Sequence, residues 1–177
     1  MKKEISFIFL ALLSVLAACS KEDFNYQSEF EKSFQKWENF KSDSGNSYTY
    51  VVYNSSWVGA SWQTQITVSN GVVTERSFKM ISAQGLDEIP LADREWTENG
   101  SELNSHTTGA ALLTLDQIYE KARIDWLVKR KNTITYFEAQ NNGLLSSCGY
   151  VEDGCQDDCF VGVRISSIKA IAFCYTR

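Results

Sequence analysis

Residues 60–80 read ASWQTQITVSNGVVTERSFKM, and this stretch decides the fold because it predicts a β-hairpin. Two alternating runs, 60–68 and 72–80, flank Ser69-Asn70-Gly71, a sequence that favours a tight turn. A two-residue Asn-Gly turn would scatter the apolar side chains, whereas a three-residue loop with a left-handed Gly71 gathers them on one face. We therefore expect the three-residue loop. It pairs Val68 with Val72, Trp62 with Phe78 and Ala60 with Met80.

Further strands are expected on both sides of this hairpin. Residues 47–54 alternate, with aromatic or β-branched side chains on both faces, which is typical of a central strand. After residue 130, Asn141-Asn142-Gly143 and Ser166-Ser167 are expected to be turns between strands. The strands expected in this part of the chain are 132–139, 144–148, 159–165 and 168–175.

Two segments have the apolar spacing of amphipathic helices. The first is 28–41, with its aromatic side chains on one face and a capping box expected from Ser28 and Glu31. The second is 115–128, preceded by a capping box of Thr114 and Gln117. The basic run 129–131 follows it and complements the helix dipole. The sequence thus predicts an α+β fold, with two helices packed on an antiparallel sheet in the order α-βββ-α-βββ(β).

Residues 82–110 show little periodicity and are expected to form a long loop, which is unusual and often functional. Trp96 lies in this loop. It is a candidate interaction residue, either exposed to a partner or packed so that it fixes the loop to the domain. His106 has no neighbouring residues that would make it a base or a metal ligand, and we expect a solvated loop histidine.

The N-terminus has the pattern of an export signal. Lys2 and Lys3 precede the apolar run 5–18, which has the length of a signal-peptide core and is too short to span a bilayer. Leu16-Ala17-Ala18-Cys19 then resembles the lipobox of bacterial lipoproteins. That resemblance implies cleavage before Cys19 and lipid on its sulfur; an ordinary secretory signal is the alternative. We divide the chain into a signal peptide (1–18), a tether (19–27) and one α+β domain (28–177).

The start of the tether, Ser20-Lys21-Glu22-Asp23, resembles the signal that sends lipoproteins of Bacteroidota to the outer face of the outer membrane. A plain solvated tether is the alternative. The expected location is therefore the outer membrane, at the cell surface or on its periplasmic face, with the membrane as a partner through Cys19.

Composition narrows the choice of partners. Removal of residues 1–18 leaves 15 Lys and Arg against 21 Asp and Glu, a formal charge of −6, which argues against nucleic acid as a partner. The 10 Phe, 8 Tyr and 5 Trp, with a single Pro, indicate a well-filled core.

Four cysteines remain besides Cys19, and an even number in an exported chain predicts two disulfides. If Ser166-Ser167 is a hairpin turn, Cys159 faces Cys174, which predicts Cys159–Cys174 and leaves Cys148–Cys155. A zinc site is the alternative, but the spacing has no CxxC pair. The acidic stretch 152–158 is expected to be a solvated loop. Calcium is the alternative there, although the spacing does not fit an EF-hand.

Several short segments together resemble one family of small secreted bacterial proteins, many of them lipoproteins, described only as a domain of unknown function. The resemblance covers about residues 30–166, while the long segment 82–110 and the four cysteines depart from the pattern. The segments are Tyr48-Thr49-Tyr50, Val68-Ser69-Asn70-Gly71-Val72, Thr114-Leu115-Asp116-Gln117-Ile118-Tyr119 and Ile134-Thr135-Tyr136. The repeated helix-plus-sheet order also resembles beta-lactamase-inhibitor-like proteins at the level of the fold.

The sequence contains no readable nucleophile–base pair, so we expect a non-enzymatic, lipid-anchored binding module without a cofactor. Its partner would be another envelope protein. The alternative is a hydrolase of the envelope that uses carboxylates, which would require a pocket with two converging acids.

Overall fold

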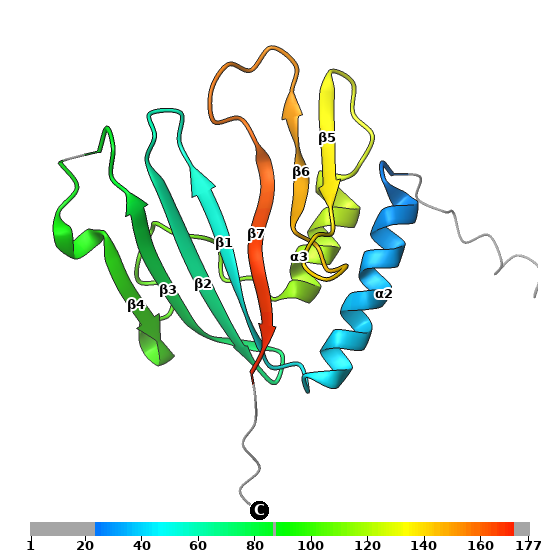
Figure 1. Cartoon of the computed structure of the whole chain (residues 1–177), viewed down its shortest axis with the longest axis horizontal. Helices are drawn as coiled ribbons and strands as arrows, with labels where there is room; N and C mark the ends of the chain where they lie inside the picture. Colours follow the sequence, from blue (N-terminus) through cyan, green and yellow to red (C-terminus); the bar gives the residue numbers. More distant parts are fainter. Residues whose placement is uncertain (1–23, 87, 172–177) are drawn as a thin grey trace, which may run out of the picture.

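The computed structural model describes residues 24–86 and 88–171, in which two helices pack on a seven-stranded antiparallel sheet (Figure 1). The α+β class is confirmed. The strand order across the sheet is β4-β3-β2-β1-β7-β6-β5, so β1 is central, as its sequence predicted. The strands are β1 (Tyr48–Ser55), β2 (Ser61–Ser69), β3 (Val72–Ser82), β4 (Glu95–Asn99), β5 (Thr133–Glu138), β6 (Ser147–Glu152) and β7 (Val161–Ala170).

The long helix α2 (Gln27–Asp43) begins without a side-chain cap. Its N-cap residue Tyr26 is left-handed (φ 60°) and makes no capping hydrogen bond, so the capping box predicted from Ser28 and Glu31 is wrong. Packing of aromatic rings, rather than a capping hydrogen bond, fixes the start of α2. Phe24 is buried with its ring 5.2 Å from that of Phe30, so the last residues of the predicted tether belong to the folded domain.

The second helix starts where the sequence predicted. Thr114 Oγ1 accepts a hydrogen bond from the Gln117 backbone N–H, and Gln117 Oε1 accepts one from the Thr114 N–H, which is a complete capping box. The helix runs as α3 (Leu115–Lys121) and continues as one π-helical turn, η4 (Ala122–Trp126). Arg130 closes the C-terminal end by donating to the Asp125 carbonyl at 2.7 Å, as expected of a cation beside the last carbonyls.

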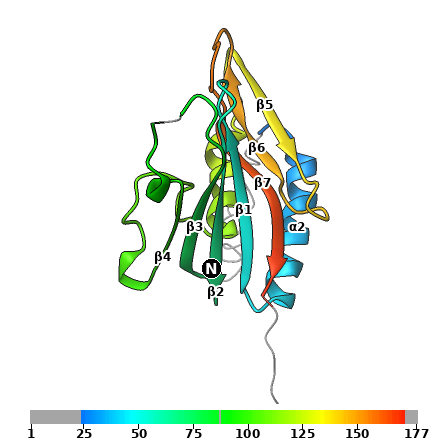
Figure 2. The ribbon, with the colours of Figure 1, turned by 60° about the vertical axis from the view of Figure 1, so that its left-hand side comes forward.

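The core lies between these helices and one face of the sheet (Figure 2). Trp37 of α2 is fully buried, and its ring lies 5.2 Å from that of Tyr48 on β1. The Tyr48 hydroxyl accepts a hydrogen bond from the Leu115 backbone N–H at 2.8 Å, which joins β1 to the start of α3. Tyr48, Tyr50 and Val52 all face this core, as the alternation in 47–54 predicted.

The hairpin of β2 and β3 has the predicted inward face but a different turn and register. Asn70 and Gly71 both have positive φ (50° and 80°) and form a two-residue turn, so the three-residue loop is wrong. A register shift between Thr67 and Val68 then displaces the pairing, and Trp62 faces Met80 rather than Phe78. Because this shift is one residue, it restores the apolar side chains to one face despite the shorter turn.

The C-terminal hairpin predicted at Ser166-Ser167 is also wrong, because β7 runs through these residues as a single strand. Its register with β1 shifts between Val51 and Val52, which leaves Ser166 as the extra residue of a bulge. The bulge lets one strand pair with both neighbours: β7 bonds to β6 before residue 165 and to β1 from residue 165 on. This strand therefore joins the two halves of the sheet.

Segment 82–110 contains regular structure that the sequence did not indicate. The edge strand β4 pairs with β3, and short 3₁₀ turns, η2 (Leu91–Asp93) and η3 (Gly100–Glu102), flank it. The observed order is therefore α-ββββ-α-βββ. The additional strand lies in the predicted loop, not at the C-terminus.

Candidate functional site

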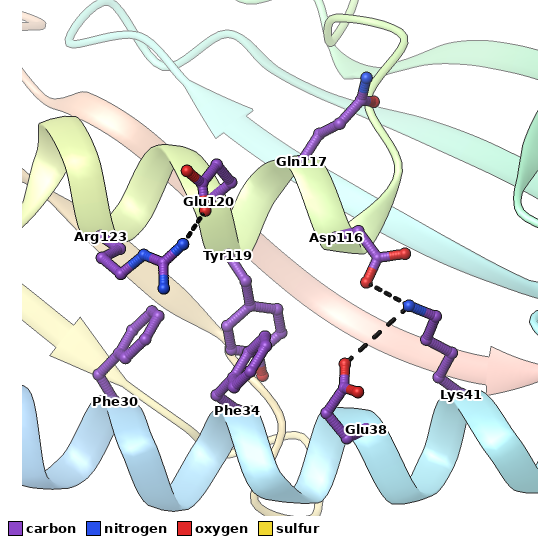
Figure 3. A pocket seen from close by; sticks show the side chains of 9 residues that line it. All are labelled: Phe30, Phe34, Glu38, Lys41, Asp116, Gln117, Tyr119, Glu120 and Arg123. Carbon is purple, nitrogen blue, oxygen red and sulfur yellow. Dashed lines mark hydrogen bonds and ion pairs between the residues drawn. The ribbon is translucent and has the colours of Figure 1, made fainter. Parts of the chain in front are cut away.

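A groove of about 440 Å³ lies between α2 and α3 on the side of the helices that faces solvent (Figure 3). Its α2 residues recur at intervals of three or four, so they project from one face of the helix. The lining residues are Phe30, Phe34, Glu38 and Lys41 from α2, and Asp116, Gln117, Tyr119, Glu120 and Arg123 from α3 and η4.

Three aromatic rings form the floor of the groove. Phe30 and Phe34 are stacked with their ring centroids 6.0 Å apart, and Phe34 meets Tyr119 edge to face at 5.6 Å. Phe30 and Tyr119 are buried, but Phe34 is 37% exposed. The groove thus offers one accessible apolar side chain on a packed aromatic base.

Tyr119 is held in place by its hydroxyl. That oxygen lies 2.8 Å from Ser33 Oγ and accepts a hydrogen bond from the Leu145 backbone N–H at 3.0 Å. Burial raises the pKa of Tyr119, although the bonds to Ser33 and Leu145 act in the opposite direction. The phenol is therefore neutral at physiological pH. Its ring supports the floor of the groove, and its hydroxyl does not act as an acid or a base.

One end of the groove is closed by an ion pair between the helices. Asp116 Oδ1 accepts hydrogen bonds from Lys41 Nζ at 2.9 Å and from Trp37 Nε1 at 2.8 Å. Glu38 Oε1 lies 4.0 Å from the same Lys41 nitrogen. These contacts fix the start of α3 against the end of α2, and they place both signs of charge at this rim.

At the other end, Arg123 forms an ion pair with Glu120 one turn earlier on the helix. Both side chains are about half exposed, so the pair contributes little to stability and is free to exchange partners. The groove therefore has an apolar floor and charges of both signs at its two ends. This arrangement suits a ligand that carries an apolar group between polar or charged groups.

The groove is not predicted by the sequence. The sequence predicts that the aromatic face of 28–41 packs on the sheet, which is correct for Phe30 and Trp37 but only partly for Phe34. The feature of the sequence that could have indicated the groove is the width of the aromatic face of α2. Ser33, not Phe34, completes the buried side of α2, because Tyr119 reaches across from α3 to bond to it.

The disulfide pairing predicted from the sequence is wrong. The structure joins Cys155 to Cys159, with their Cα atoms 6.1 Å apart, and the buried Cys148 has no disulfide partner among the described residues. Cys148–Cys155 is not formed because Cys148 points into the core from β6 while Cys155 lies in the exposed loop after it. Cys159–Cys174 depended on the absent hairpin, and Cys174 lies outside the described residues, as does Cys19.

Trp96 is not an exposed anchor for a partner. It is 8% exposed, stacked between Phe78 at 5.3 Å and His106 at 4.0 Å, so the prediction that it fixes the loop to the domain is confirmed. His106 is partly solvated, but its Nδ1 lies 3.1 Å from Oε2 of Glu98. The role of Glu98 is not predicted by the sequence, because its buried partner, Arg76, lies on another strand.

Within residues 24–86 and 88–171, no group of three or more His, Cys, Asp and Glu side chains is arranged to hold a metal ion. No helix in the same ranges has the length and apolar character needed to cross a bilayer.

Comparisons with protein-family models, curated proteins and solved structures found no match for this chain. The resemblances to a lipoprotein family and to beta-lactamase-inhibitor-like proteins therefore stay predictions.

Proposed function

We propose that this protein is a lipid-anchored binding module of the bacterial cell envelope, and that it captures a segment of a partner envelope protein in the groove between α2 and α3. The observation that carries the proposal is the partly exposed Phe34 on a fixed aromatic base, framed by charges of both signs. The lipobox-like sequence before Cys19 supports the envelope location.

The chemistry of the groove favours a protein segment. An apolar side chain of the partner can cover Phe34, and its flanking charged residues can pair with the two rims. Aromatic and Arg side chains supply much of the binding energy in protein interfaces, and this groove combines Phe34 with Arg123. Each rim carries charges of both signs, Lys41 with Asp116 at one end and Arg123 with Glu120 at the other, so charged residues of either sign in the bound segment can find a partner there.

The alternative, a hydrolase that uses carboxylates, needs two converging acids of which one stays protonated near neutral pH. The acids in this groove do not form such a pair. Glu38 and Asp116 face Lys41, and Glu120 faces Arg123, so each carboxylate is paired with a cation. This arrangement supports binding over catalysis at this groove.

The test is site-specific photocrosslinking in the native envelope. A photoreactive phenylalanine analogue replaces Phe34 in the full chain, and the same analogue replaces Leu91 as a matched control. Leu91 is 81% exposed and lies in the β3–β4 connection, away from the groove. We expect a defined crosslinked protein at Phe34 that is absent at Leu91 and identifiable by mass spectrometry.

Charge reversal adds a second readout. Lys41→Glu breaks the pairing with Asp116 at one rim and should reduce the crosslink at Phe34 several-fold, as measured by the crosslinked fraction of the folded protein. Identical crosslinks at Phe34 and Leu91, or none at either position, would reject the groove as a capture site.

A further inference from the structure

A second pocket, of about 540 Å³, is lined by residues of the β1–β2 turn and of the β6–β7 loop. Figures 1 and 2 show that these two loops lie at the same end of the sheet. It is separate from the groove between the helices, since the two share no lining residue. The side chains that matter to its chemistry are Asn54, Trp57, Trp62, Asp157, Asp158 and Arg164.

The unusual feature of this pocket is Trp57. Its side chain is 73% exposed, although tryptophan is one of the residues most strongly buried on average. Trp57 sits on a tight turn in which the Ser56 N–H bonds to the Ala60 carbonyl at 2.8 Å and Gly59 has a φ of +93°. The turn therefore presents a large flat ring to solvent from a fixed backbone, next to the half-buried Trp62.

The opposite wall is also fixed. The Cys155–Cys159 disulfide closes the loop that carries Asp157 and Asp158. Phe160 lies against Gly149, where even a Cβ atom would come within 2.6 Å of the ring. Arg164 stacks on Phe160, with its guanidinium carbon 3.8 Å from the ring centroid, so the polar edge of the cation has a defined position.

The pocket carries charges of both signs. Asp157 and Asp158 disfavour a phosphate or carboxylate ligand, and Arg164 places guanidinium donors beside them. Among the described residues, none of these three side chains forms an ion pair, so all three are available to a ligand as hydrogen-bonding groups. A neutral ligand rich in hydroxyl groups can use carboxylate acceptors and guanidinium donors together.

From these observations we propose that the pocket binds a neutral carbohydrate. A sugar ring has an apolar C–H face that stacks on Trp57 and a rim of hydroxyls that donate to Asp157 and Asp158 and accept from Arg164. The Asn54 amide offers both a donor and an acceptor to the same rim. The rigid turn and the disulfide reduce the ordering that binding requires.

The test uses the full chain purified in a zwitterionic detergent, since sugar-based detergents would compete. An array of neutral hexose and N-acetylhexosamine oligosaccharides identifies a bound sugar, and calorimetric titration measures its affinity. A second arm presents the same series of neutral sugars as the headgroups of neutral glycolipids in phosphatidylcholine vesicles. Binding in both arms indicates a sugar read in any context, and binding in the vesicle arm alone indicates a glycolipid headgroup.

Trp57→Ala should weaken sugar binding at least about tenfold, given the usual contribution of a stacked aromatic ring. Asp157→Asn keeps the shape of the loop and should weaken binding less. Phe34→Ala, in the groove between the helices, is the matched control and should leave sugar binding unchanged, so this result is independent of the proposed partner capture. No bound oligosaccharide in either arm, or equal affinity for wild type and Trp57→Ala, would overturn the proposal.

Discussion

Arg76 on β3 donates its Nε to Oε1 of Glu98 on β4 at 2.7 Å, and the two side chains are only 4% and 1% exposed. The remaining hydrogen-bonding groups of the pair are occupied by the chain that follows β4. Arg76 donates to the carbonyls of His106 and Ala110, and Glu98 accepts from the backbone N–H of Asn104 and of His106. The ion pair therefore fixes residues 104–110 over the inner face of the sheet.

We expect Arg76→Met to lower the free energy of unfolding by roughly 3–5 kcal/mol, because it leaves the Glu98 carboxylate buried without its cation. The double variant Arg76→Met, Glu98→Leu should lose much less, since no uncompensated charge remains. Urea denaturation followed by tryptophan fluorescence measures both. A single variant that loses less than the double would show that the pair is not compensated as described.

Glu98 also predicts the pH dependence of stability. Burial alone would raise the pKa of its carboxyl, but hydrogen bonds from Arg76, Asn104 and His106 outweigh it and hold the pKa below its ordinary value. The folded chain then binds fewer protons than the unfolded chain, whose glutamates titrate near about 4.3. The contribution of the Glu98 carboxylate to the free energy of unfolding is fully present well above that value, and it is lost as the pH falls below about 5.

The measurement is the urea midpoint between pH 7 and pH 3. In Glu98→Gln the acid-induced loss should be smaller than in wild type, on top of a lower stability at pH 7. Glu95→Gln is the matched control, because Glu95 is exposed and pairs with Lys79 on the surface; its pH profile should follow wild type. Parallel profiles for wild type and Glu98→Gln would contradict the assignment.

Trp96→Ala should reduce stability by roughly 3–5 kcal/mol, as expected for removal of a buried tryptophan. The ring is stacked on Phe78 and His106, and the Arg76 guanidinium lies 5.0 Å from its centroid. Thermal unfolding monitored by circular dichroism gives the loss. Trp57→Ala, on the exposed turn, should change stability by no more than about 0.5 kcal/mol, and similar losses in the two variants would argue against a packing role for Trp96.

Peptide mapping tests the cysteine chemistry. Without reductant, cleavage after Glu152 should separate Cys148 from a fragment in which Cys155 and Cys159 remain joined. Burial raises the pKa of the Cys148 thiol, so it should react with an alkylating reagent only after unfolding. A recovered Cys148–Cys155 or Cys159–Cys174 peptide, or rapid labelling of native Cys148, would contradict the structure.

Metabolic labelling tests lipid attachment at Cys19. Cells grown with a clickable palmitate analogue should label the wild-type protein, and Cys19→Ser should lose both the label and the membrane fraction, because the acyl chains supply the anchoring energy. Ser20→Ala leaves Cys19 in place and should retain the label. An unlabelled wild-type protein would reject the lipobox interpretation and with it the anchored form of the proposed function.

Local signals in the sequence determined those parts of the fold that depend on neighbours along the chain. Thr114 and Gln117 specify the start of α3, since both capping partners lie within one turn. The alternation in 47–54 identifies β1 and its buried face, and Asn142-Gly143 supplies the positive φ values of the turn after β5. These features require only backbone sterics, side-chain periodicity and a short-range hydrogen bond.

Contacts between distant segments decided the rest. The bulge at Ser166 arises because β7 must pair with both β1 and β6, and β4 forms because Glu98 meets Arg76 across 22 residues. The groove exists only where Tyr119 reaches α2, and the second pocket only where two loops about 100 residues apart converge. Periodicity in a sequence reports which face of an element is buried, but the partner that covers that face is fixed only when the whole chain packs.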